Sequence, residues 1–203
     1  MRARYLLAAV FVIGLAACPV RAEEQAKPAG DAAAEQEMMK KWQEAATPGE
    51  AHKRLESLVG NWSHTVRWSM TPDEKPTESK GTNTNTMILG GRFLKQETQG
   101  EAMGQPFEGL GISGYDNVRK EYNSVWIDSM GTGMMTGTGQ FDAAQNAITE
   151  KGEFSCPITG NQHMIYRSVW KIIDPNHYTY EMYTAAPDGK EFRSMDIAYE
   201  RVQ

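Results

Sequence analysis

The sequence predicts a mainly β protein: an antiparallel up-and-down barrel of about ten strands, with one or two N-terminal helices capping one end. Two observations support this. After Gly60-Asn61-Trp62 the chain alternates between apolar and polar residues in about ten short stretches separated by turn residues, and no further helical pattern follows. A meander of that length normally closes, because closure removes its exposed edges. An open sandwich is the structural alternative.

The first 22 residues have the pattern of an export signal. A basic start is followed by an apolar run, residues 5–17, that is too short to span a membrane. Val20-Arg21-Ala22 fits ordinary cleavage after residue 22, whereas Leu15-Ala16-Ala17-Cys18 fits a lipobox, in which Cys18 would be lipidated. We therefore expect a periplasmic or secreted protein, with a lipid anchor in the outer membrane as the alternative.

Beyond this signal the sequence predicts a linker and one domain. Residues 23–34 contain nothing large and apolar to bury, which is typical of a flexible linker, and residues 35–203 have the length of a single domain. The net charge is −5, and the signal carries three arginines and no acid, so the exported part is more acidic still. Since phosphate must be neutralised by Lys and Arg, we expect no nucleic-acid partner. The pattern does not define an oligomeric state.

Two helices are expected before the barrel. In the first, Met38 and Trp42 fall on one face that is expected to be buried. The second is expected to begin at an N-cap, Thr47, with Glu50 completing a capping box, and to end at Gly60.

The alternating pattern predicts the extent of each strand. The strands are expected at residues 62–70, 77–89, 91–99, 106–115, 121–128, 132–141, 147–155, 162–173, 177–185 and 191–202. Glycines recur at spacing two at positions 109 and 111, 131 and 133, and 137 and 139. We expect bends at barrel corners there, with close approach of another side chain or a ligand as the alternative.

Strand alternation places large apolar residues of several strands inside the barrel. The expected apolar walls of a ligand site are Val66, Trp68, Trp126, Met135, Trp170 and Met182. His64 and Tyr180 are the expected polar anchors among them. The chain also has 12 methionines, whose flexible side chains suit adaptable apolar pockets. These features favour binding of a small apolar or amphipathic molecule, without covalent chemistry.

No motif predicts catalysis or a metal site. Residues 109–114 match G-x-G-x-x-G, but no helix follows to hold a pyrophosphate, so dinucleotide binding is rejected. The histidines lack metal-ligand spacing, His52 is expected on the exposed side of its helix, and Cys156 has no disulfide partner. An enzyme that uses inward His64 or a barrel carboxylate is one alternative function. The carboxylates considered are Glu97, Asp128 and Asp196. An envelope structural or interaction protein with a filled barrel is the other.

Several segments resemble the bacterial family known as domain of unknown function 1579. They are residues 42–62, 88–94 (ILGGRFL), 103–109 (MGQPFEG), 114–117 (GYDN) and 126–128 (WID). The resemblance covers about residues 35–203 and implies an often exported, calycin-like barrel with no catalytic residues to transfer. In calycins a late arginine packs on the first-strand tryptophan. We therefore expect Gly60, Trp62 and Arg201 to be structural, with Arg193 as an alternative to Arg201.

The chain is also distantly similar to nitrobindin-type ten-stranded haem barrels. The longer Gly-x-Trp-x-Gly-x-Gly form of that motif is absent, since Ser63-His64-Thr65-Val66 follows Trp62. The sequence therefore does not support haem binding, although the distant similarity leaves it as an alternative, and we expect no other cofactor and no metal.

Overall fold

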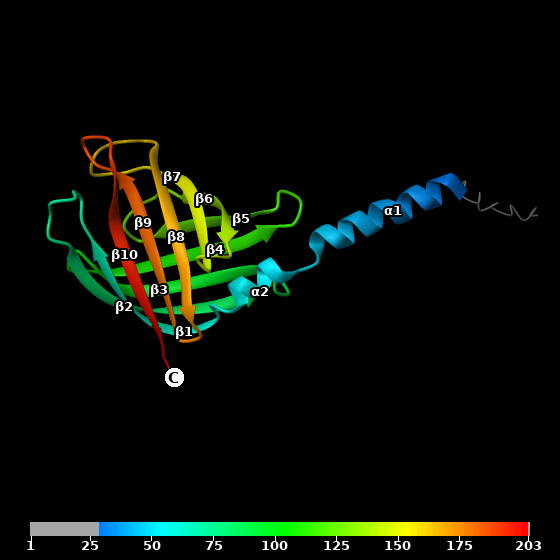
Figure 1. Cartoon of the computed structure of the whole chain (residues 1–203), viewed down its shortest axis with the longest axis horizontal. Helices are drawn as coiled ribbons and strands as arrows, with labels where there is room; N and C mark the ends of the chain where they lie inside the picture. The colour runs from blue at the N-terminus through cyan, green and yellow to red at the C-terminus, as the bar shows by residue number, and fades with distance from the viewer. Residues whose placement is uncertain (1–28, 203) are drawn as a thin grey trace, which may run out of the picture. The chain divides into compact units, whose positions relative to one another are not determined.

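The protein is a closed β-barrel of ten antiparallel strands in a computed structural model that describes residues 29–202 (Figure 1). The helices are α1 (Ala29–Ala46) and α2 (Glu50–Glu56). The strands are β1 (Gly60–Trp68), β2 (Thr77–Ile88), β3 (Phe93–Ala102), β4 (Gln105–Asp116), β5 (Glu121–Asp128), β6 (Met135–Asp142), β7 (Ala147–Phe154), β8 (Met164–Asp174), β9 (His177–Ala185) and β10 (Glu191–Arg201). The export signal predicted at residues 1–22 lies outside the described residues.

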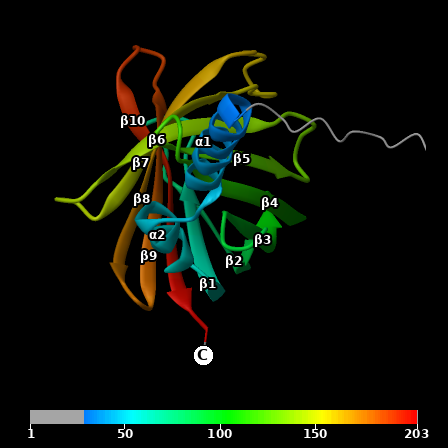
Figure 2. The ribbon, with the colours of Figure 1, turned by 90° about the vertical axis from the view of Figure 1, so that its right-hand side faces the viewer.

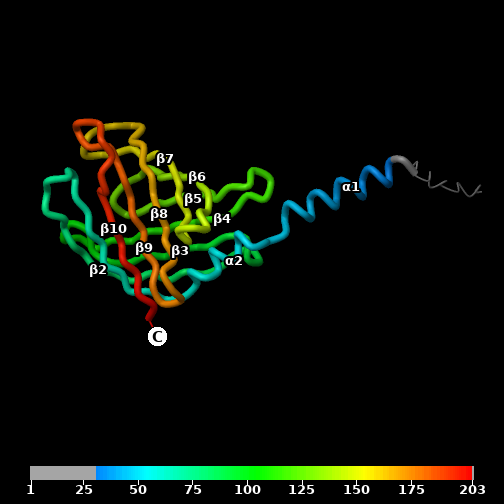
Figure 3. Tube along the Cα trace, in the orientation of Figure 1, coloured from blue at the N-terminus to red at the C-terminus, as the bar shows by residue number. Residues whose placement is uncertain are grey.

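Each strand pairs with its neighbours in the chain, and the barrel closes between the first strand and the last. The order around the barrel is β1-β10-β9-β8-β7-β6-β5-β4-β3-β2, and β1 pairs with β10 in the register Trp62 to Arg201 and His64 to Tyr199. Figure 3 shows β8, β9 and β10 side by side. The predicted up-and-down barrel is confirmed, and the open sandwich is excluded.

The two ends of the barrel differ. We call the end where β1 begins the α2 end, because α2 lies against it (Figure 2). The far end carries the loop from β1 to β2 and, in turn, those after β3, β5, β7 and β9. Leu55 and Leu58 are buried at the α2 end, in one cluster with Trp62, Tyr178 and Tyr199. The α2 end is therefore closed by apolar packing.

The chain divides into two compact units, Met1–Met39 and Lys40–Gln203, and the barrel belongs to the second. Helix α1 begins at Ala29, inside the predicted linker of residues 23–34, so the linker prediction is wrong for residues 29–34. Their alanines, with the Glu and Gln that follow, are strong helix formers. The expectation that Trp42 is buried is also wrong, since it is 69% exposed.

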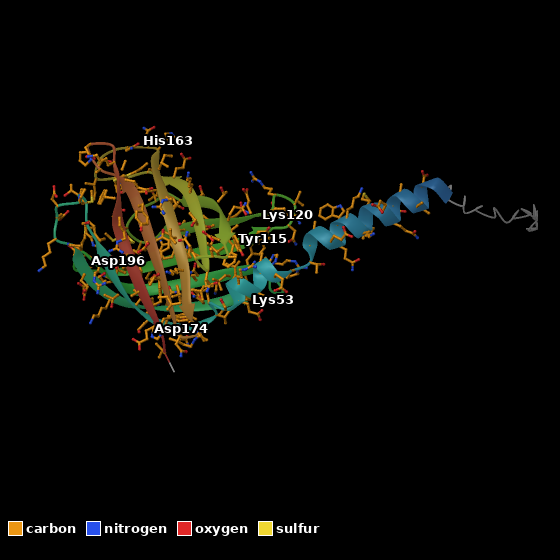
Figure 4. All side chains as sticks on the ribbon, in the orientation of Figure 1. Lys53, Tyr115, Lys120, His163, Asp174 and Asp196 are labelled. Carbon is orange, nitrogen blue, oxygen red and sulfur yellow. The ribbon has the colours of Figure 1, made fainter. Side chains whose placement is uncertain are left out.

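Helix α2 begins later than its capping pattern predicts. Gly49 is the N-cap, and its backbone N–H donates to Nδ1 of His52 at 3.0 Å. The Thr47 hydroxyl instead donates to the carbonyl of Gln43, in the last turn of α1, at 2.6 Å, so it does not cap α2. His52 is buried with its ring against Tyr115, which corrects its expected exposure. Tyr115 lies on the α2 side of the barrel, whereas His163 lies in a far-end loop (Figure 4).

No described helix combines the length and the apolar character that a membrane-spanning helix requires.

Candidate functional site

The candidate site is the inner face of the barrel between its middle and the far end. Five of the predicted wall residues lie on this face, and we call them the apolar wall: Val66, Trp68, Trp126, Met135 and Met182. All five are only partly buried. Large apolar side chains that point inward are fully buried when a barrel interior is packed. The apolar wall is therefore partly accessible to solvent.

The other predicted site residues lie deeper. His64 and Tyr180 occupy the middle of the barrel and are 7% and 9% exposed. Trp170 lies nearer the α2 end, where its ring stacks on Tyr178 and lies 4.6 Å from that of Tyr180. The structure thus separates Trp170 from the apolar wall and places the two polar anchors below that wall.

A buried carboxyl group that sequence reasoning missed lies in the middle of the barrel. Glu150 is 4% exposed, and Nε1 of Trp170 donates to its Oε2 at 3.3 Å. The Ser124 and Ser168 hydroxyls lie beside it. Within residues 29–202, no lysine or arginine pairs with this carboxyl. Burial raises the pKa of Glu150 above the ordinary glutamate value, so its neutral form is favoured.

Two tyrosine hydroxyls complete this polar centre. We use the name Glu150 cluster for Ser124, Glu150, Tyr166, Ser168 and Tyr180. Burial raises the pKa of both tyrosines, and the nearby Glu150 carboxyl adds to the effect. The Ser168 hydroxyl is fully buried and makes no hydrogen bond of good geometry. A buried hydroxyl without a partner is costly, which marks the cluster as incompletely satisfied.

His64 is a second incompletely satisfied group. Its Nδ1 is buried and has no hydrogen-bond partner, and the ring lies 5.5 Å from that of Tyr199. Burial lowers the pKa of this imidazole, so the ring is held in its neutral form. A neutral imidazole in an apolar environment can accept or donate one hydrogen bond with the unused nitrogen.

Between the Glu150 cluster and α2 the interior is nearly filled. A cavity of about 10 Å³ remains there. Its lining includes Leu55, Leu94, Gln96, Ser113 and Glu150. That volume suits a single water molecule and nothing larger. There is therefore no room for a ligand between the Glu150 cluster and α2.

The glycines of the inner face make room for large side chains. A Cβ at Gly109 would lie 2.3 Å from the Trp126 ring, and one at Gly137 would lie 2.6 Å from the Tyr166 hydroxyl. A Cβ at Gly139 would instead lie 2.1 Å from the backbone carbonyl oxygen of Thr149. Close approach of a side chain, the alternative expectation, is therefore confirmed at Gly109 and Gly137. Gly131 and Gly133 lie in the loop after β5.

Of the carboxylates considered from sequence, only one faces the interior. Asp128 points inward and accepts a hydrogen bond from Nε1 of Trp126 at 2.9 Å. Glu97 lies on the outer face, where it pairs with a lysine, and Asp196 lies there beside Arg67. In the described part of the chain, no group of three or more His, Cys, Asp or Glu residues could hold a metal ion.

The residues predicted to be structural meet at the α2 end. The Arg201 guanidinium lies 4.1 Å from the centre of the Trp62 ring and donates to the carbonyls of Val59 and Pro175. Gly60 has a φ of +135°, which strains any other residue, and a Cβ there would lie 2.2 Å from this guanidinium. Nε1 of Trp62 donates to the Leu58 carbonyl. Arg193 instead lies outside, paired with Glu181 and Asp196.

The sequence does contain a signal for Glu150. Glu150 lies four residues before the large apolar Phe154 on the same strand, and alternation places the two on the same face. The signal is masked because Lys151 and Glu153, which face outward, give the stretch the composition of a solvated strand.

Two solved structures are similar to this chain. The crystal structure of Rv2717c from M. tuberculosis is 17% identical, covers 77% of this chain and 100% of its own, and has a TM-score of 0.58. A de novo designed fluorescence-activating β-barrel is 16% identical, covers 73% of this chain and 96% of its own, and has a TM-score of 0.42. No curated protein matches the sequence.

The first of these likenesses shows the barrel fold and nothing more, because its sequence identity is low. The sequence itself matches the family described as "Protein of unknown function (DUF1579)" over residues 47–201. That match covers α2 and every strand of the barrel. The chain therefore belongs to the DUF1579 family.

Proposed function

We propose that this protein binds a small apolar or amphipathic molecule in the far half of its barrel, without a cofactor and without covalent chemistry. The observation that carries the proposal is the incomplete burial of the apolar wall. Trp68, Trp126 and Met182 face inward and remain open to solvent, above a centre of buried polar groups. Apolar walls with a few buried polar groups are typical of small-molecule sites.

Binding to the apolar wall can be tested with Nile red, a neutral apolar fluorophore. We expect saturable binding and a loss of roughly 1–2 kcal/mol for Trp126→Ser, because that change removes a large part of the wall. Ile127→Ser is the matched control, since Ile127 is the next residue and faces outward. Equal loss in both variants, or no saturable binding by the wild type, would contradict the proposal.

The natural ligand calls for a separate experiment. Native mass spectrometry of protein from its own cell envelope, with a refolded sample as a blank, should reveal a retained small molecule. The absence of any retained mass, together with no binding of Nile red, would favour a structural or interaction protein.

Export belongs to the same proposal, because an envelope protein meets a different set of small molecules. Intact-mass analysis of the envelope protein distinguishes the outcomes. Cleavage after Ala22 gives a free N-terminus at Glu23, whereas lipidation gives a mature chain that begins at Cys18. A chain that keeps residues 1–17 would overturn export.

Acid–base catalysis is a second candidate function, and one observation favours it. Glu150 is buried without a cation and its pKa is raised, which are properties of catalytic carboxyl groups. The test is to incubate the protein with a small-molecule extract of its own cells. If masses change with the wild type and not with Glu150→Gln, while Nile red still binds to both, the protein is an enzyme.

A further inference from the structure

The barrel interior contains acids and almost no bases. Apart from the tyrosines and the exposed turn residues Asp174 and His177, four ionisable side chains of the strands point inward. They are His64, Asp128, Glu150 and Arg201. Arg201 lies at the α2 end and is already bound to backbone carbonyls. Every other lysine and arginine of the ten strands faces outward. An anionic ligand would therefore find no free cation inside.

The Glu150 cluster offers several hydrogen-bond acceptors close together. Glu150 and Ser168 are direct partners across β7 and β8, and Ser124 lies on the other side of the carboxyl. The Ser168 hydroxyl is fully buried beside Glu150 and Tyr180 and makes no hydrogen bond of good geometry, so its oxygen can accept one. The rings of Trp170 and Tyr180 lie beside these groups. The cluster thus combines a carboxyl, two serine hydroxyls and two tyrosines, with the Trp170 ring beside it.

We propose that the ligand carries a protonated amine, which binds between the Glu150 carboxylate and the hydroxyls of Ser124 and Ser168 while its apolar part contacts the apolar wall. This inference rests on the proposed function and specifies its ligand class. An ammonium group has three donors, which match one carboxylate and two hydroxyl oxygens. Neighbouring aromatic rings attract a cation as well. Asp128, nearer the far end, adds negative charge along the path.

The charge of the ligand's polar group decides how well it fits the Glu150 cluster. A carboxylate or phosphate ligand would bring a second negative charge next to Glu150, or leave its own charge unpaired, and both are unfavourable in a buried site. A neutral alcohol could bind to the hydroxyls but would gain nothing from the carboxylate. The site should therefore rank an amine above an alcohol, and an alcohol above an acid, when the apolar chains are identical.

The test uses octylamine, octanol and octanoate as probes with the full-length protein, measured by isothermal titration calorimetry. We expect octylamine to bind about 10-fold or more tightly than octanol, as for other charge-assisted hydrogen bonds, and octanoate to bind the weakest. Glu150→Gln should remove the preference for the amine and keep the binding of octanol. Glu153→Gln is the matched control, because Glu153 lies on the same strand and faces outward.

A second variant keeps the proposal testable if Glu150→Gln does not fold. Ser168→Ala deletes a hydroxyl that makes no hydrogen bond of good geometry, so folding should persist, and octylamine affinity should fall roughly 3-fold to 10-fold. If octylamine and octanol bind equally and neither variant changes this, the amine inference is wrong, while the proposed function stands. If octanoate binds the tightest, the inference is also wrong. If none of the three probes nor Nile red binds, the inference and the proposed function both fail.

Discussion

At the scale of single residues, Glu150 makes the barrel sensitive to pH. Burial raises its pKa in the folded protein above that of the unfolded chain, so the folded state holds this proton more tightly. The stabilising contribution of Glu150 to the free energy of unfolding is therefore fully present when the pH is below the pKa of Glu150 in the unfolded chain. This contribution is lost as the pH rises from that pKa through the higher pKa of Glu150 in the folded protein. Ionised Glu150 is thus a cost to the empty barrel, which an amine ligand would offset.

This cost can be measured with Glu150→Gln, which does not titrate. The free energy of unfolding of the wild type minus that of the variant should fall as pH rises above the ordinary glutamate pKa, because only the wild type must bury a carboxylate. Urea unfolding at several pH values gives this difference. A difference that stays constant or grows with pH would contradict the burial of an unpaired carboxyl.

Gly109 offers a second test at the residue scale. An added methyl group would meet the Trp126 ring at 2.3 Å, so Gly109→Ala should lower the free energy of unfolding by about 1–3 kcal/mol and shift tryptophan fluorescence. Gly131→Ala is the control, because a Cβ there meets only one atom, at 4.0 Å. If both variants unfold at the same urea concentration, Trp126 does not cover Gly109 as described.

At the scale of elements, Arg201 joins the last strand to the segment that follows α2. Its guanidinium bonds to carbonyls on both sides of the barrel seam and stacks on Trp62. Arg201→Lys keeps the charge and loses the planar fork, so we expect a loss of roughly 1–3 kcal/mol in thermal or urea unfolding. Arg193→Lys, on the same strand, should have a smaller effect because Arg193 lies on the exposed outer face.

The sequence predicts strands better than it predicts helix boundaries or the site. Alternation defines β5 and β9 to the residue, since one face of each is buried and the turns have distinctive residues. The predicted N-cap Thr47 is wrong because Gly49 is the N-cap of α2, and the His52 side chain accepts a hydrogen bond from the Gly49 backbone N–H. Alternation predicts only that the Glu150 side chain points inward. Whether a cation lies next to its carboxyl depends on which strands are neighbours in the barrel, and alternation does not predict that.

At the scale of the whole molecule, the barrel interior is asymmetric along its axis. The α2 half is filled by the core that includes Leu58, Trp62 and Tyr178, with room for about one water. The far half holds the partly buried apolar wall. Such an arrangement concentrates stability at one end and leaves the other available for binding, so variants of the wall should alter binding more than folding.

The division into two units leads to a prediction for the N-terminal segment. The barrel seam, the core and the Glu150 cluster all lie within Lys40–Gln203. Removal of residues 1–39 should therefore change the free energy of unfolding by less than about 0.5 kcal/mol and leave Nile red binding intact. Asn117 still donates to the carbonyls of Ala45 and Thr47 in this variant, so the segment that precedes α2 keeps that attachment to the barrel.

Urea unfolding of the two chains under one set of conditions checks this prediction. A loss above about 1 kcal/mol would mean that the first unit contributes contacts to the barrel. Unchanged stability with weaker Nile red binding would instead mean that the first unit takes part in the ligand site. The two readouts together therefore show whether barrel folding and ligand binding depend on Lys40–Gln203 alone.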